Sequence, residues 1–381
     1  IVSFTNLFYQ SNTSLKPSIF FSSIVLPDEL IEAILVRLPV SSLLRFKCVS
    51  KLWFSVISDP QFAKSQFDLA ASPNNRLLLN VTDDLKFQSL DIDSSPPNNE
   101  SAVLNYPSEP FFHTSIFYRK RYLEFLGSCR GFVLILLPNL CADFLVCNPT
   151  TGVQRLIPQS ASFSYSPASL YGIGYDESTD DYLLVSINSY GCDRTINLFS
   201  LKTNLPRSLT LDHEYHQYHD CGSRSGLLLH GSLHWLVTSS AKKHHGLLAF
   251  DLVGKCLSEI ALPPDLALEL KKKSYCLREM RGCLGLCDFG YGGITEIWIM
   301  KEYKVQSSWT KIVFSTHDIH TKPRFFPICF TKCGDIFGST MNGRLLKLND
   351  KGKLLAVWPR ESKYHLFYSG MYTASLLSLP S

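Results

Sequence analysis

Residues 26–62 read LPDELIEAILVRLPVSSLLRFKCVSKLWFSVISDPQF, and this stretch decides how the N-terminal part of the chain folds. Its large apolar residues recur at spacings of three and four, which places them along one side of an α-helix. Pro39 and the pair Asp59-Pro60 interrupt the pattern, while Ser41 and Ser50 are of the type that caps helix N-termini. The stretch therefore predicts three short helices.

This helical segment carries more large apolar residues than three short helices can hide among themselves. A unit of about 45 residues is close to the size below which a domain needs outside support. Exposed apolar surface of this kind usually marks a site for a partner protein. The spacing alone leaves two alternatives open, a partner site or packing of the whole segment against the rest of the chain.

The same stretch resembles the F-box. The resemblance rests on Leu26-Pro27, Ile34-Leu35, Leu38-Pro39, Leu43-Leu44, Val49, Lys51-x-Trp53, Ile57 and Asp59-Pro60, with Ser50 in place of the commoner cysteine. It implies docking onto the adaptor Skp1, which joins a cullin scaffold and a RING subunit. The residues implied for the Skp1 contact, or for the helical core behind it, are Leu26, Pro27, Leu30, Ile34, Leu38, Pro39, Leu43, Leu44, Val49, Trp53 and Ile57.

The sequence pattern changes near Leu77, where short β-rich runs are broken by Gly, Pro, Asn and Asp. A strand, a polar turn and a second strand recur with a period of about 50 residues, which is typical of kelch-type propeller blades of four strands. A single blade cannot bury both of its faces, whereas blades packed in a ring can. The turns of this repeat lie at Asn148, Ser200, Asp251, Met300 and Asn349, with a weaker copy at Asp91, and a glycine precedes an apolar strand at Gly131, Gly174, Gly231, Gly282 and Gly334.

These repeats resemble the F-box-associated region of plant F-box/kelch proteins. The matching pieces include GSCRGFVLI, VCNPTTG, YGIGYDESTDDYLLVSI, HGSLHWLV and the closing YTASLLSL. The resemblance implies a mostly β protein, in which a small three-helix F-box precedes a kelch-like β-propeller, and we expect six blades. The Gly-Gly doublet of kelch blades occurs only at Gly292-Gly293, so a two-sheet β-sandwich stays open as the alternative.

The turn-rich segment Ala71-Ser72-Pro73-Asn74-Asn75 separates the helical segment from the β-rich repeats. We expect an N-terminal extension without ordered structure over residues 1–25, the F-box over 26–70, a linker over 71–76 and the β domain over 77–381. The first 25 residues lack a basic start and a small-residue cleavage site, so we do not expect a signal peptide.

The composition narrows the class of function. Hydrophobic residues make up 45% of the chain and charged residues 18%, which is typical of a globular protein. A formal charge of +4 is too small to indicate nucleic-acid binding, and the best apolar run, residues 132–137, is too short for a membrane span. The 12 cysteines are scattered, which favours a reducing compartment and hence the cytoplasm or the nucleus.

No catalytic motif is recognisable, and we expect no catalytic residue, metal or cofactor. The histidines of His213-x-x-His216-x-x-His219 have a spacing that could ligate zinc, although a polar loop is favoured. Two C-x3-C pairs, Cys283 with Cys287 and Cys329 with Cys333, lie on expected strands and are interpreted as buried thiols rather than a zinc ribbon.

The resemblance implies the substrate-recognition subunit of a Skp1–cullin–F-box ubiquitin ligase, which binds an unknown target protein through its β domain and performs no chemistry itself. Two alternatives remain at this point. One is a Skp1-binding scaffold that does not lead to ubiquitylation, and the other is an enzyme that uses a pocket of the propeller.

Overall fold

The chain divides into two compact units, residues 1–73 with 375–377 and residues 74–374 with 378–381. The computed structural model describes residues 27–69, 75–81, 86–93, 123–137, 143–157, 163, 165–166, 169–188, 195–210, 218–220, 223–239, 244–270, 273, 275–288, 293–315, 324–340, 344–358 and 364–380. Leu26 of the expected Skp1 contact lies outside the described residues, as does the expected N-terminal extension.

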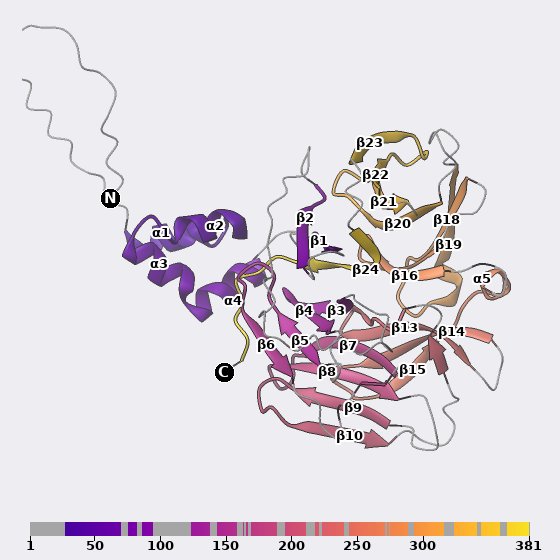
Figure 1. Ribbon diagram of the computed structural model, residues 1–381, viewed down its shortest axis with the longest axis horizontal. Helices are drawn as coiled ribbons and strands as arrows, with labels where there is room; N and C mark the ends of the chain where they lie inside the picture. The colour runs from indigo at the N-terminus through magenta and orange to yellow at the C-terminus, as the bar shows by residue number, and fades with distance from the viewer. Residues whose placement is uncertain are drawn as a thin grey trace, which may run out of the picture. The chain divides into compact units, whose positions relative to one another are not determined.

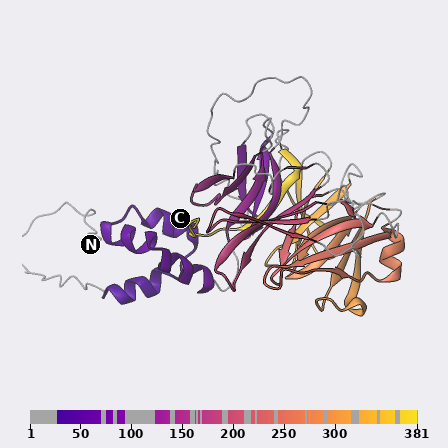
Figure 2. The same ribbon diagram turned by 90° about the horizontal axis from the view of Figure 1, so that it is seen from below.

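The described residues of the first unit form four helices (Figures 1 and 2): α1 Asp28–Leu35, α2 Val40–Phe46, α3 Lys51–Ser58 and α4 Pro60–Leu69. Ser50 caps α3 as predicted, because its hydroxyl accepts a hydrogen bond from Trp53 N at 3.1 Å. Pro39 rather than Ser41 is the N-cap of α2, so the predicted start of that helix was two residues late.

The expected count of three helices was one short. Asp59-Pro60 ends α3, but it also begins α4, because proline suits the first turn of a helix, where its missing N–H needs no partner. Asp59 Oδ1 accepts hydrogen bonds from Gln61 N at 2.7 Å and from Phe62 N at 3.1 Å, which caps the new helix. Gln66 Nε2 then donates to Leu38 O at 3.3 Å and ties α4 to the chain before α2.

The second unit is a six-bladed β-propeller, as predicted, which excludes the two-sheet alternative (Figure 1). The described strands form six antiparallel sheets in the orders β2-β1-β24, β3-β4-β5-β6, β7-β8-β9-β10, β11-β13-β14-β15 with β12 also on β13, β16-β17-β18-β19 and β20-β21-β22-β23. Their bounds are β1 Asn75–Val81, β2 Lys86–Asp91, β3 Glu124–Cys129, β4 Phe132–Leu136, β5 Phe144–Cys147, β6 Gln154–Ile157, β7 Ser169–Asp176, β8 Asp181–Asn188, β9 Thr195–Ser200, β10 Pro206–Thr210, β11 Tyr218–Asp220, β12 Leu227–Leu229, β13 Ser232–Ser239, β14 His244–Asp251, β15 Leu257–Ile260, β16 Tyr275–Met280, β17 Cys283–Asp288, β18 Ile294–Met300, β19 Trp309–Ser315, β20 Phe325–Phe330, β21 Ile336–Thr340, β22 Leu345–Leu348, β23 Leu354–Trp358 and β24 Tyr364–Thr373.

The core of the propeller lies between neighbouring blades, not inside one of them. Trp235 is fully buried between the sheet of β7 to β10 and the sheet of β13 to β15, together with Leu170, Val185 and Phe250. Corresponding apolar clusters lie between the next blades along the chain and between the last and first ones. Each blade therefore buries its faces only in the presence of its neighbours.

The 50-residue period has a local physical cause. At the end of the third strand of several blades, a polar side chain accepts a hydrogen bond from a backbone N–H two to four residues later, which fixes the turn to the fourth strand. The acceptors are Asn148 Oδ1, Ser200 Oγ, Asp251 Oδ1 and Asn349 Oδ1, and Asp91 Oδ1 does the same after β2.

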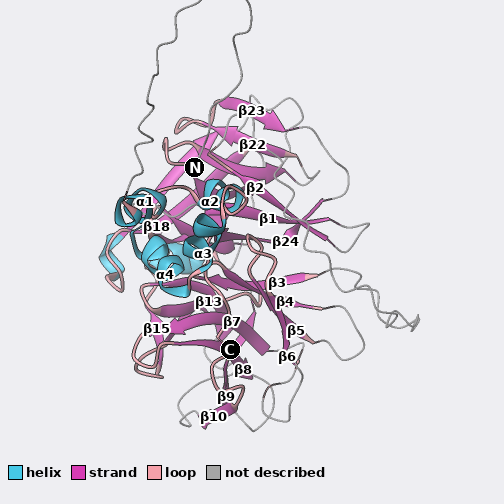
Figure 3. Ribbon diagram, turned by 90° about the vertical axis from the view of Figure 1, so that its left-hand side faces the viewer, coloured by secondary structure: helices cyan, strands magenta, loops and turns pink. Residues whose placement is uncertain are grey.

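The recurrence of a glycine before an apolar strand has a separate cause. Arg130-Gly131, His230-Gly231 and Arg281-Gly282 each hold two successive residues at positive φ, the conformation of tight hairpin turns. Gly174 does not belong to this set, because it lies inside β7, where an added Cβ would come within 2.3 Å of Leu252. Among the described residues, helix is confined to α1–α4, the short α5 Pro264–Glu269 of the propeller and the 3-10 turn η1 Gln306–Ser308 (Figure 3).

Candidate functional site

The first candidate surface belongs to the helical unit and begins on α1. Leu30 and Ile34 are one helical turn apart, and 51% and 52% of their surfaces are exposed. The opposite face of the helix carries Leu35, which is 1% exposed. Two large apolar side chains on the outward face of a short helix favour contact with another protein.

Other residues implied by the F-box resemblance form the core of the helical unit instead. Leu43 and Ile57 are 0% and 1% exposed. Trp53 is half-buried, and its ring meets the ring of Phe46 edge-on at 5.2 Å between centroids. Of the remaining described candidates, Leu38 and Leu44 are half-buried, while Pro27, Pro39 and Val49 are exposed.

The structure adds two apolar residues that the sequence reasoning did not select. Leu52 and Phe54 of α3 are 43% and 56% exposed, whereas Ile57 of the same helix is buried. Lys47 Nζ lies 5.9 Å from the centroid of the Phe54 ring. The signal was present in the run Leu52-Trp53-Phe54, because three consecutive large apolar residues cannot all face one side of a helix.

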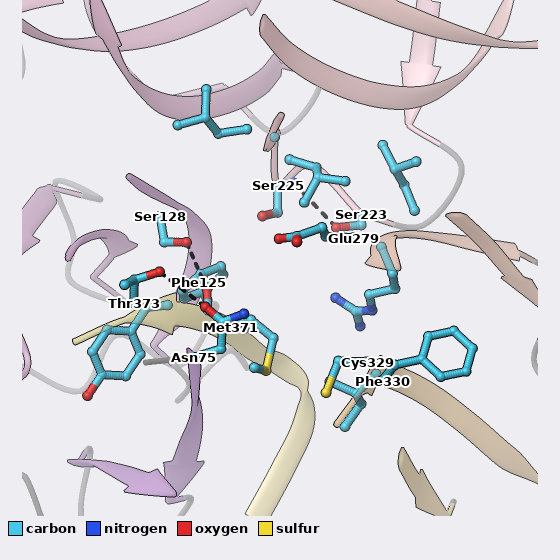
Figure 4. A pocket seen from close by; sticks show the side chains of 18 of the residues that line it. Asn75, Phe125, Ser128, Ser223, Ser225, Glu279, Cys329, Phe330, Met371 and Thr373 are labelled. Atoms are coloured by element: carbon cyan, nitrogen blue, oxygen red, sulfur yellow. Dashed lines mark hydrogen bonds between the residues drawn. The ribbon is translucent and has the colours of Figure 1, made fainter. Parts of the chain in front are cut away.

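The second candidate is a cavity of about 190 Å³ in the propeller unit, where strands of several blades meet (Figure 4). Ser128 Oγ donates to Met371 O at 2.7 Å and Thr373 Oγ1 donates to Asn75 Oδ1 at 3.2 Å, so these hydroxyls are already engaged. The remaining lining is Phe125, Ser223, Ser225, Gly226, Leu227, Leu228, Leu277, Arg278, Glu279, Arg281, Ile328, Cys329, Phe330, Gly370 and Tyr372.

Charged side chains line one wall of this cavity. Arg281 lies over the ring of Phe330, with 4.2 Å from its guanidinium carbon to the centroid, and donates to Gly334 O at 3.2 Å. Arg278 Nε is buried and has no hydrogen-bond partner among the described residues. The cavity therefore offers both cationic and apolar contacts, as a pocket that receives side chains of a partner would.

Elsewhere in the propeller, the buried side chain of His234 contacts other residues of the fold. His234 is fully buried, with Nε2 2.8 Å from Tyr303 Oη and Nδ1 3.2 Å from Leu227 O. The pKa of His234 is lowered to about 4, mainly by burial and to a smaller extent by the charges of the nearby Lys304 and His230. The imidazole is therefore neutral near pH 7.

Within the part of the chain that the structure describes, the histidine segment forms no zinc site. His213 and His216 lie outside the described residues, and His219 belongs to β11, opposite Thr238. Over the described residues, no group of three His, Cys, Asp or Glu side chains is placed to hold a metal ion, and no helix is long and apolar enough to cross a membrane.

The thiols of the C-x3-C pairs do not pair within their motifs. Cys287 and Cys329 are buried as expected, whereas Cys283 is half-buried and Cys333 is exposed. The strand register instead places Cys287 opposite Cys276 of the preceding strand. That pairing follows from the two-residue turn at Arg281-Gly282, a signal that was visible in the sequence.

Comparison with known proteins supplies the family of both units. Residues 25–65 match the F-box domain, and residues 78–368 match the F-box associated beta propeller domain. The chain is 29% identical over 301 residues to the F-box/kelch-repeat protein At3g23880 of Arabidopsis thaliana, covering 77% of this chain and 80% of that protein. It is also 29% identical over 317 residues to the F-box protein CPR1 of the same plant, covering 75% and 72%.

Proposed function

Because this chain belongs to the plant-type F-box proteins with an F-box associated beta propeller domain, we propose that it is the target-binding subunit of a Skp1–cullin–F-box ubiquitin ligase. The observation that carries the proposal is the presence, on one chain, of an F-box with outward-facing apolar side chains and of a complete propeller.

The helical unit is the attachment site in this proposal. Leu30, Ile34, Leu52 and Phe54 are large, apolar and about half exposed, so that an adaptor such as Skp1 would remove them from water. Leu43 and Ile57 support this surface from the core. Through Skp1, the chain would join a cullin and a RING subunit.

The propeller is the target-binding unit in this proposal. Its blades form a rigid frame, and the cavity lined by Arg278, Arg281 and Phe330 offers contacts of several chemical kinds. The subunit would contribute no bond chemistry. It would accelerate ubiquitin transfer by holding a lysine of the target near the ubiquitin-charged enzyme. We propose the cytoplasm or the nucleus as its location, where such complexes work.

Affinity purification tests this proposal in cells with the proteasome blocked. The full chain should capture Skp1, a cullin and a ubiquitylated target. A variant with Leu30→Ala and Ile34→Ala should keep the target and lose the ligase subunits. Capture of Skp1 and target without ubiquitin transfer in a reconstituted reaction would favour the scaffold alternative and contradict the ligase role.

A further inference from the structure

Two cysteines face each other across a hairpin of the propeller. Strands β16 and β17 are joined by the turn Arg281-Gly282, with φ of 56° and 75°, and this turn fixes the register that sets Cys276 opposite Cys287. Directly opposed residues of antiparallel strands have Cα atoms about 4.5–5.5 Å apart, which is within the range that a disulfide spans. Cys276 Sγ lies 3.6 Å from Cys287 O.

The surroundings of this pair favour a thiolate. Arg278 follows Cys276 by two positions and so lies on the same face of β16, and its buried Nε has no partner among the described residues. Hydrogen bonding from the Cys287 thiol lowers the pKa of Cys276, burial opposes this, and the charge of Arg278 lowers it again. Cys287 has its pKa raised, mainly by burial.

The two thiols differ in exposure in a way that gives each a distinct role. Cys276 is half-buried, whereas Cys287 is fully buried within the apolar cluster between this blade and the next. Cys329 of β20 belongs to the neighbouring blade and is also buried. A small oxidant therefore meets Cys276 first, and Cys287 is its nearest partner across the strands.

We propose that Cys276 and Cys287 form an oxidative modification site, in which a hydroperoxide oxidises Cys276 and Cys287 then closes a cross-strand disulfide. This site shares Arg278 with the cavity proposed for target binding, but it does not rest on the proposed ligase role.

The reaction balances in two steps. The Cys276 thiolate attacks one oxygen of hydrogen peroxide, an S–O bond forms, the O–O bond breaks, and the departing hydroxide takes up a proton to give water. Cys287 then loses its proton and attacks the sulfenic sulfur, so that the S–S bond forms, the S–O bond breaks and a second water leaves. Two thiols are oxidised and one peroxide is reduced to two waters.

Mass spectrometry of the full chain tests the site directly. The reduced protein is treated with hydrogen peroxide, quenched, denatured, alkylated and digested with trypsin without reduction. Cys276 is the one cysteine of the tryptic peptide 274–278, and Cys283 and Cys287 share the peptide 282–301. We expect these two peptides to be recovered as a disulfide-linked pair.

Matched variants identify the partner and the order of events. Cys283→Ser should keep the linked pair, whereas Cys287→Ser should abolish it and leave Cys276 as a sulfenic acid that dimedone traps. Arg278→Met should slow alkylation of Cys276 by iodoacetamide at pH 7 about threefold or more, and Arg278→Lys should largely restore it.

Internal controls are Cys129 and Cys147, which are buried, and burial raises the pKa of each well above its ordinary value. They should stay unmodified until the protein is denatured. Recovery of the peptide 274–278 fully alkylated after peroxide, or linked through Cys283 or Cys329, would overturn the proposal. Because the wild-type chain gives this readout, the test does not depend on whether a variant folds.

Discussion

Thr373 of β24 donates a hydrogen bond from Oγ1 to Asn75 Oδ1 of β1 at 3.2 Å, which joins residues 298 positions apart. The same two residues are register partners in the sheet of β2, β1 and β24. The last strand of the chain therefore completes the blade that the first strand begins. This strand ends at Thr373, the second residue of the run YTASLLSL at residues 372–379.

Because β24 completes the first blade, the stability of the propeller should depend on this last strand. Removal of residues 364–381 should abolish cooperative thermal unfolding of the β domain, because β1 and β3, which both contact β24, would each lose a partner surface. Tyr372→Phe is the milder control. It removes a buried hydroxyl 2.8 Å from Ser89 Oγ and should lower the free energy of unfolding by about 1 kcal/mol. An unchanged melting transition of the truncated chain, followed by tryptophan fluorescence, would contradict closure.

Exposed and buried residues of the F-box should respond differently to truncation. Leu30→Ala with Ile34→Ala should weaken Skp1 capture by about 2 kcal/mol or more while the helical content stays the same. Leu43→Ala should instead destabilise the helical unit by about 2–5 kcal/mol, because it leaves a cavity in the core. Circular dichroism and Skp1 pull-down together separate the two effects, and equal loss of structure in both variants would refute the assignment.

Phe54 is predicted to contribute to the same adaptor surface. Phe54→Ala should reduce the affinity for Skp1 by at least about 1 kcal/mol, since an exposed aromatic ring gains most from burial at an interface. Leu205→Ala is the matched control, because Leu205 is a 65% exposed apolar residue of the propeller. Equal affinities of the two variants for Skp1 in calorimetry would show that Phe54 does not belong to the adaptor surface.

The lowered pKa of His234 predicts that the free energy of unfolding decreases in acid. Its folded pKa is about 4, below the ordinary value of 6.5, so the unfolded chain binds the proton first as the pH falls. Stability is therefore full above pH 6.5 and is lost between pH 6.5 and 4, by roughly 3 kcal/mol. His234→Gln should flatten this dependence in urea unfolding, while His230→Gln, which removes only a minor cause of the low pKa, should keep most of it. A wild-type stability that is constant over this window would contradict the prediction.

Much of the fold was readable because its causes are local. The turn acceptors Asn148, Asp251 and Asn349 repeat at a fixed interval, and each sets the same turn through its own backbone. A period of about 50 residues then leaves few architectures that can bury every blade. Ser50 was predictable as a cap for the same reason, since a cap involves only residues of its own helix start.

The candidate surface was less predictable because it depends on how helices pack. Leu30 and Leu43 are both leucines of short helices with apolar residues at helical spacing, yet one is about half exposed and the other is fully buried. Helical spacing shows which residues share a face but not which face meets another helix. The cavity was beyond prediction for a related reason, because strands far apart in the chain, such as those of Ser128, Arg278 and Met371, contribute to it.

Binding of the full chain to a plant Skp1 adaptor, measured by isothermal titration calorimetry, tests the central claim, attachment through the F-box, most directly. We predict a one-to-one complex for the wild-type chain and loss of detectable binding when Leu30→Glu and Ile34→Glu place charges on the outward face of α1. A folded wild-type chain that does not bind Skp1, or a double variant that binds it with unchanged affinity, would contradict docking through this surface.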